Sequence, residues 1–267
     1  MGHSRSPLRY MNEADVAHAS RNAFNGLPLH IMNQLLSAGN PEADSPAGLL
    51  GIPFYFNHFY QWEGPVTATS AGGWTLTSVT GTGTIVRTNT REGNIVLTAD
   101  ATGSCNPTLQ LGSATLGANF LYKVGKRIWV FARLKMGTVA STEFFFGLGL
   151  PDTQPTVTNT FPADGIFFHK TTTATKLSFD VRASGTSTSK ALITGTLVDD
   201  TYRTIGFQVE AAGNVIPYDN GTALTASAVA AGNANLPATT SALQLMVAFL
   251  GASQTVTLDW LLAAQEI

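Results

Sequence analysis

The chain has 267 residues, of which 44% are hydrophobic and only 12% are charged, and its formal net charge is −2 at pH 7. Lys and Arg are scattered singly, which argues against nucleic acid as a partner, and no run of eighteen apolar residues is present to span a membrane. The low charge has two interpretations: a chain that packs against other chains, or a β-rich protein whose outward positions are filled by Thr.

The first sixty residues predict an arm rather than a domain. Asn12 can cap a short helix that begins at Glu13 and ends near Phe24, and Pro28 can open a second one. Neither helix is long enough to be stable alone in water. We therefore predict an extended N-terminal arm with one or two short helices over residues 1–63, followed by a single domain over residues 64–267.

An aromatic segment ends the arm. Six aromatic residues occur between positions 54 and 62, namely Phe54, Tyr55, Phe56, Phe59, Tyr60 and Trp62. They are either the first strand and an end plug of the following domain, or anchors that insert into a partner, because aromatic side chains bring large contact area at low entropy cost. Both interpretations can hold together, and the six residues are our candidate partner-binding site.

From Trp74 onward the apolar residues alternate with period two, which predicts strands. The inward sets include alternate residues of 127–135, 143–150, 176–182 and 205–209, and we expect Val256, Leu258, Trp260 and Leu262 to share one face. Residues 243–250 are apolar on both faces, which predicts a strand that lies centrally or against the N-terminal arm. Turn residues separate the runs, and only residues 223–231 suggest a helical turn. The pattern predicts an all-β antiparallel β-sandwich of the jelly-roll type.

No motif for catalysis, metal or cofactor binding is present. His169 follows an apolar strand segment and is predicted to be solvated, and Asp180 stands alone on its strand. Glycoside hydrolysis needs two carboxylates about 5 to 9.5 Å apart, and no strand carries such a pair. The acidic turns at Asp164, 199–200 and Asp219 are explained by turn chemistry without calcium. The single cysteine, Cys105, predicts a loop filler made in a reducing cytoplasm.

Several segments together resemble a known fold family. The runs FFFGLGL from Phe144, ADGIFFHK from Ala163 and KLSFDV from Lys176, with YRTIGF, VIPYDNG and VTLDW later in the chain, resemble lectin-like (concanavalin-type) jelly rolls. Domains of this kind behind an N-terminal arm are similar to virion structural proteins of tailed bacteriophages, especially capsid decoration or cement proteins. The resemblance covers about 130 residues.

We therefore predict a non-enzymatic virion protein that binds and stabilises a phage capsid shell through its arm and sandwich. Its partners would be other virion proteins, chiefly the major capsid protein, with a homo-oligomer possible and neither nucleic acid nor membrane involved. It would be made in the host cytoplasm and lie on the capsid exterior. The alternative is a carbohydrate-binding, lectin-like module for attachment to the host surface, with exposed aromatic residues such as Trp129. A hydrolase on the same fold would need a carboxylate pair in a groove.

Overall fold

The structure is a computed structural model that describes residues 54–57, 70–71, 74–78, 80–88, 94–112, 120–151, 155, 161–191 and 195–266, with only the backbone described at 54–57, 70–71 and 191. Both predicted arm helices lie outside these ranges. None of the helices within the described ranges has the length and apolar character that crossing a membrane requires.

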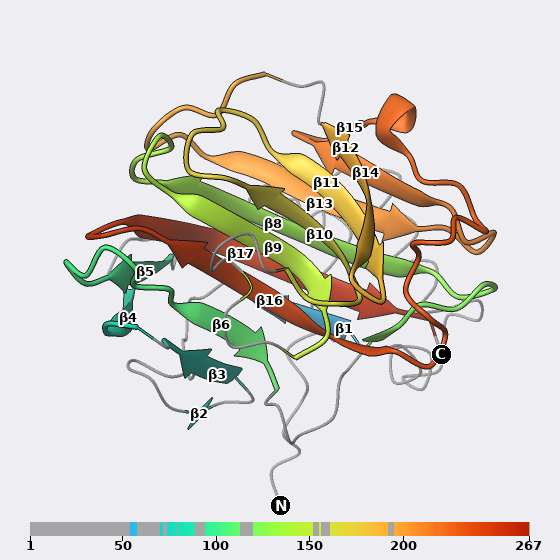
Figure 1. The fold of residues 1–267 in the computed structure, drawn as a ribbon, viewed down its shortest axis with the longest axis horizontal. Coiled ribbons are helices and arrows are strands. Elements are labelled where there is room, and N and C mark those ends of the chain that lie inside the picture. The colour runs from blue at the N-terminus through green and yellow to red at the C-terminus, as the bar shows by residue number, and fades with distance from the viewer. Residues whose placement is uncertain are drawn as a thin grey trace, which may run out of the picture.

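Two antiparallel sheets form a sandwich (Figure 1). Sheet A has the order β15 (Thr222–Ala223), β14 (Val215–Asp219), β13 (Arg203–Val209), β8 (Ile128–Met136), β17 (Thr255–Gln265), β5 (Ile95–Ala99) and β4 (Gly83–Arg87), and β1 (Phe54–Asn57) also pairs with β17. Sheet B has the order β12 (Thr186–Ala191), β11 (Ser178–Ala183), β10 (Gly165–Lys170), β9 (Glu143–Gly149), β16 (Ala242–Leu250), β6 (Thr108–Leu111), β3 (Trp74–Thr77) and β2 (Ser70–Ala71), and β7 (Phe120–Leu121) also pairs with β16. The predicted all-β sandwich is therefore confirmed.

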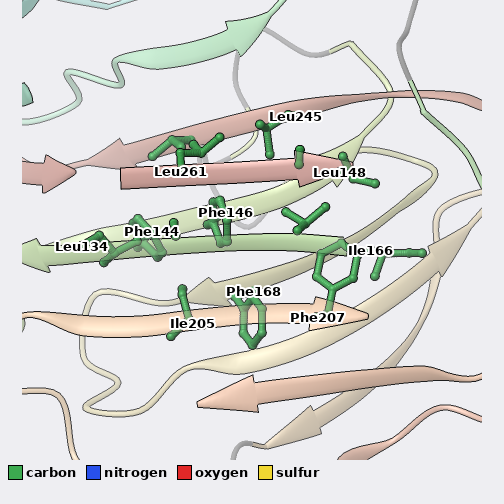
Figure 2. Close-up of a cluster of buried hydrophobic side chains, with 14 of the residues drawn as sticks. Leu134, Phe144, Phe146, Leu148, Ile166, Phe168, Ile205, Phe207, Leu245 and Leu261 are labelled. Atoms are coloured by element: carbon green, nitrogen blue, oxygen red, sulfur yellow. The ribbon is translucent and has the colours of Figure 1, made fainter. Parts of the chain in front are cut away.

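The main core lies between the sheets and comes from the predicted alternation. Ile128, Val130, Ala132 and Leu134 of β8 are buried against residues of sheet B such as Phe144, Phe146, Phe168 and Phe179. Figure 2 shows a group of these side chains, including Leu134, Phe146 and Phe207, contributed by strands of both sheets. Burying a side chain of this size stabilises the fold by about 1.5–3 kcal/mol.

Strand β16 is central in sheet B, between β9 and β6, as its apolar sequence predicts. Both of its faces are buried: Leu243, Leu245 and Val247 lie in the core, while Met246 and Ala248 lie on the opposite side. The predicted helical turn is a short 3-10 helix at Thr225–Ser227.

One face assignment is wrong. Val256 and Leu258 lie in the core as expected, but Trp260 and Leu262 lie on the opposite face of sheet A, and Leu261 and Ala263 take the core positions. The cause is a β-bulge between Leu258 and Trp260 in the pairing with β8. A bulge adds one residue to one strand, so every later side chain changes face.

The outer faces, which point away from the other sheet, are also apolar in part. On sheet A, Trp129, Phe131, Trp260 and Leu262 are 0% exposed although they alternate with core residues. Trp129 was expected to be exposed in a carbohydrate-binding module, and that expectation is wrong. Alternation along the chain therefore shows which side chains share a face of a strand. In β8 and β17 of sheet A, both faces are largely buried.

Candidate functional site

The outer face of sheet B carries the arrangement of side chains that best fits a binding site. Strands β10 and β11 form an antiparallel pair in which Phe167 lies opposite Asp180 and His169 lies opposite Ser178. His169 and Asp180 are therefore diagonal neighbours, which places both side chains on the same face. The diagonal position brings an imidazole and a carboxylate together on a surface that is otherwise largely aromatic.

His169 and Asp180 interact away from bulk water. Nε2 of His169 lies 3.2 Å from Oδ1 of Asp180, close enough for an ion pair when the ring is protonated, and the two side chains are 13% and 5% exposed. In the described part of the chain, Nδ1 and Nε2 of His169 and Oδ1 of Asp180 are buried without a hydrogen bond, so their contact is an ion pair only when the ring is protonated. His169 was predicted to be a solvated histidine, and this prediction is wrong because the strand register places it against Asp180 and two phenylalanines.

The ring of Phe161 lies over this pair. Its centroid is 4.4 Å from that of His169, 5.4 Å from that of Phe167 and 6.4 Å from that of Phe145. Phe145 and Phe167 are fully buried, whereas Phe161 is half-buried. Phe161 is therefore the aromatic surface of this cluster that a ligand can reach.

A network of hydrogen bonds fixes the rim beside Phe161. Arg182 donates from Nη1 to the carbonyl oxygen of Phe161 at 3.1 Å, and from Nε and Nη2 to that of Gly185 at 3.0 and 2.8 Å. Asp164 accepts from the backbone N–H of Ser184 at 2.6 Å and from the hydroxyl of Ser241. These bonds tie the ends of β10, β11 and β16 together and hold the backbone of Phe161 in place. We call Phe161, Asp164, His169, Asp180 and Arg182 the sheet B site.

Glycine makes room for the aromatic cluster. Gly147 lies opposite Phe167 in the β9–β10 pairing and has a φ of +152°. A Cβ atom at Gly147 would lie 2.5 Å from the carbonyl oxygen of Ile166 and 2.7 Å from Cβ of Phe167. A larger residue would therefore push Phe167, and with it the ring of Phe161, away from the sheet.

Glu143 and Asp180, which share this face, are too far apart to form a pair for glycoside hydrolysis. From the register, Glu143 and Asp180 are two strands and four residues apart, about 16 Å between backbone positions at ordinary strand spacing, and Asp164 and Asp180 are about 11 Å apart. A pair that hydrolyses a glycosidic bond lies about 5 to 9.5 Å apart. Glu143 and Asp180 therefore form no such pair.

The acidic turns hold the fold together. Asp219 forms an ion pair with Arg203, Asp199 accepts from the backbone N–H of Val139, and Asp200 pairs with Lys135. Within the described ranges, no group of three or more His, Cys, Asp or Glu side chains is placed to hold a metal ion.

The six predicted partner-binding residues are placed only in part. The backbone of β1, with Phe54, Tyr55 and Phe56, pairs with Ala264, Ala263 and Leu262 of β17. Phe59, Tyr60 and Trp62 lie outside the described residues. The segment 54–57 is therefore a strand of sheet A, as one of the two interpretations expects, and a role in partner binding stays a prediction. The boundary between residues 63 and 64 also stays a prediction.

The sheet B site was missed by sequence reasoning, although part of its signal was present. Residues 176–182 were assigned correct faces, with Asp180 outward, and His169 is outward by the same alternation. The missing information was the register of the hairpin, which makes the two residues neighbours. Phe161 lies in a loop, and no periodicity places a loop residue.

The search for similar proteins gives structural matches only: no protein-family model and no curated protein matches the chain. A protein of unknown function from Shewanella oneidensis MR-1 matches with a TM-score of 0.52 and 13% identity, over 85% of this chain and 97% of its own. A GH16 protein of Bacteroides ovatus, solved with a mixed-linkage glucan product, matches with a TM-score of 0.51 and 11% identity, over 78% and 99%.

The carbohydrate recognition domain of Emp46p, in its potassium-bound form, matches with a TM-score of 0.50 and 9% identity, over 72% of this chain and 88% of that domain. The fold is a lectin-like jelly roll. At such low identity the likeness concerns the fold alone. The matched structures of this jelly roll include a recognition domain and a GH16 protein, so the fold by itself does not separate binding from hydrolysis.

Proposed function

We propose that this protein binds carbohydrate through the sheet B site and does not cleave it. The observation that carries the proposal is the His169–Asp180 pair under the half-buried ring of Phe161. A sugar presents hydroxyl groups that both donate and accept hydrogen bonds, and an apolar C–H face that packs on an aromatic ring. Aromatic and polar side chains that converge at one place are typical of small-ligand sites.

The hydrogen-bonding capacity of the site supports a ligand rich in hydroxyls. Nδ1 of His169 is buried without a partner in the described part of the chain, and leaving such an atom unpaired costs about 1–3 kcal/mol. Once the side chains that cover this nitrogen move aside, a sugar hydroxyl can donate to it or accept from it, whichever protonation state the ring has. The likeness to the carbohydrate recognition domain of Emp46p is consistent with this ligand class.

The spacing of the carboxylates supports binding over cleavage. Asp180 and Glu143 lie too far apart in the sheet to act as an acid and base on one glycosidic bond. We therefore propose that the protein releases its carbohydrate ligand unchanged.

The proposal is tested with the full chain on a glycan array of neutral, amino and acidic sugars, followed by titration calorimetry with the best glycan. We expect Asp180→Asn and Phe161→Ala each to weaken binding about tenfold or more, because a charge-assisted hydrogen bond or an aromatic contact is worth about 1–3 kcal/mol. The matched control is Ser104→Ala, at an exposed residue of the turn between β5 and β6, and it should bind like the wild type.

Each variant is checked by thermal unfolding, so that loss of binding is not loss of fold. A wild-type chain that retains no glycan contradicts the proposed function, and full affinity in both variants contradicts the position of the site. Attachment to a phage capsid, predicted from the sequence, stays a separate prediction. Mass spectrometry of purified native particles tests it by asking whether this chain is present.

A further inference from the structure

A second polar cluster lies on the outer face of sheet A, at the β-bulge of β17. In the pairing with β8, Leu258 lies opposite Leu134 and Trp260 lies opposite Arg133, so Asp259 is the extra residue. Its carboxylate forms an ion pair with Arg133, and its side chain is 4% exposed. Bulges of this kind re-aim side chains and are frequent next to functional sites.

Three further contacts extend the cluster across the sheet. Leu258 lies opposite Ile95, which makes Asn94 the neighbour of Asp259 along β5. Asn94 donates from Nδ2 to the hydroxyl of Tyr202 at 2.6 Å, and the guanidinium carbon of Arg133 lies 4.3 Å from the centroid of the Tyr202 ring. We call Asn94, Arg133, Tyr202 and Asp259 the bulge cluster.

Two acceptors in the bulge cluster lack a donor. In the part of the chain that the structure describes, Oδ1 of Asp259 and Oδ1 of Asn94 are buried and have no hydrogen-bond partner. Each unpaired buried oxygen costs about 1–3 kcal/mol. The group that would complete the cluster must therefore donate hydrogen bonds, and it must reach two neighbouring strands.

The charges nearby select the kind of donor. Arg133 belongs to the cluster, and Nζ of Lys135 lies 5.5 Å from the Tyr202 ring centroid. Arg133 is paired with Asp259 and Lys135 is paired with Asp200, so these four charges balance. A neutral polyol suits this balance: once the side chains that cover the two oxygens move aside, adjacent hydroxyls can donate to Asn94 and Asp259, and Arg133 can donate to a hydroxyl oxygen.

We infer that the bulge cluster is a second carbohydrate site, for neutral sugars, on the sheet opposite the first site. The ligand class rests on the proposed function, whereas the position rests on the bulge and its two unpaired oxygens. The two sites lie on opposite outer faces of the sandwich, so one molecule would hold two glycans at once, pointing in opposite directions.

The test is a titration of the full chain with D-glucose, D-galactose and D-mannose, in which changes in NMR chemical shift measure binding. Glucosamine and glucuronate serve as charged comparators. Asp180→Asn disables the sheet B site and leaves the bulge cluster to be measured alone. In that background we expect the neutral sugars still to bind, and Asn94→Ala or Tyr202→Phe to weaken this remaining binding at least fivefold.

The outcomes distinguish the second site from the proposed function. Binding that is abolished by Asp180→Asn alone overturns the second site and leaves the proposed function standing. Binding that survives Asp180→Asn but is unchanged by Asn94→Ala and by Tyr202→Phe also overturns it. A wild-type chain that binds none of the sugars overturns both. Tyr202→Phe removes one oxygen only, so it reports on the site even if Asn94→Ala unfolds the chain.

Discussion

Lys170 is a charged side chain in an apolar setting. It is 1% exposed, and its Nζ donates to the carbonyl oxygens of Thr142, Thr171 and Thr172 at 2.6, 2.9 and 3.1 Å. Burial disfavours the ammonium form and lowers the pKa of Lys170 from 10.5 to about 8, while the negative charge of Glu143 opposes this shift. This lysine lies at the end of β10, next to His169 of the sheet B site.

The lowered pKa of Lys170 predicts a gain in stability at alkaline pH. Between about pH 8 and 10.5 the unfolded chain binds a proton at this lysine that the folded chain has released, so the free energy of unfolding rises with pH in this window. Below pH 8 both states are protonated and the contribution is constant. Relative to Lys170→Met, the wild type should gain up to about 3 kcal/mol across the window.

Urea unfolding at pH 7, 8, 9 and 10 measures this difference. The variant removes the titrating group, so the other groups that titrate at alkaline pH cancel in the comparison. Lys176→Met, at an exposed lysine, is the control and should show no such pH dependence relative to the wild type. A constant difference between wild type and Lys170→Met from pH 7 to 10 contradicts the prediction.

At the scale of elements, the pairing of β13 with β8 depends on a glycine. Gly206 lies opposite Phe131, and a Cβ atom there would lie 2.1 Å from the ring carbon Cδ1 of Phe131 and 2.5 Å from the carbonyl oxygen of Val130. Phe131 is 0% exposed and its ring centroid is 5.5 Å from that of Tyr218. The ring of Phe131 therefore has little room to move. Its contact with Gly206 fills this part of the outer face of sheet A.

Gly206→Ala should destabilise the fold by about 1–3 kcal/mol, the usual range for overpacking a filled site. For a chain of this size the melting temperature should fall by about 2–4 °C for each kcal/mol. Differential scanning calorimetry measures the shift. At Gly103 nothing lies within 4 Å of an added Cβ atom, so Gly103→Ala is the matched control and should melt within about 1 °C of the wild type. Equal melting temperatures for the two variants would show that Phe131 moves aside freely.

Local sequence patterns predicted most of the fold but only fragments of the candidate site. The inward residues of β8, β9, β11 and β13 follow from alternation, because strand geometry fixes which side chains share a face. Alternation failed after Leu258, because the bulge depends on how β17 pairs with β8. It also could not show that Asp180 is buried, because burial of an outward residue depends on distant segments such as the loop that contains Phe161.

At the scale of the molecule, strand β1, at residues 54–57, belongs to sheet A. Strand β1 pairs with residues 261–264 of β17, on the same edge that β5 occupies at residues 255–258. The other edge of β17 pairs with β8. Strand β1, which lies within the predicted arm, thus pairs with a central strand of sheet A.

Two truncations measure what β1 contributes. A chain that starts at residue 54 keeps β1, whereas a chain that starts at residue 61 loses it and leaves the backbone groups of residues 261–264 without that pairing. Because unpaired buried backbone groups are costly, the shorter chain should be less stable by at least about 2 kcal/mol. Chemical denaturation of both proteins gives the difference. Equal stability would mean that the pairing adds nothing.

The position of β17 also sets the order in which the protein can fold. Strands β8 and β5 do not pair with each other; β17 lies between them and is the last strand to leave the ribosome among those described. Sheet A therefore has an open centre until residues 255–265 have been synthesised, while the hairpins of β9, β10 and β11 can already form. Pairings between segments this far apart in the chain are slow, so the nascent protein exposes its apolar strands until residues 255–265 have been synthesised, and a chaperone that holds them would raise the yield of folded protein.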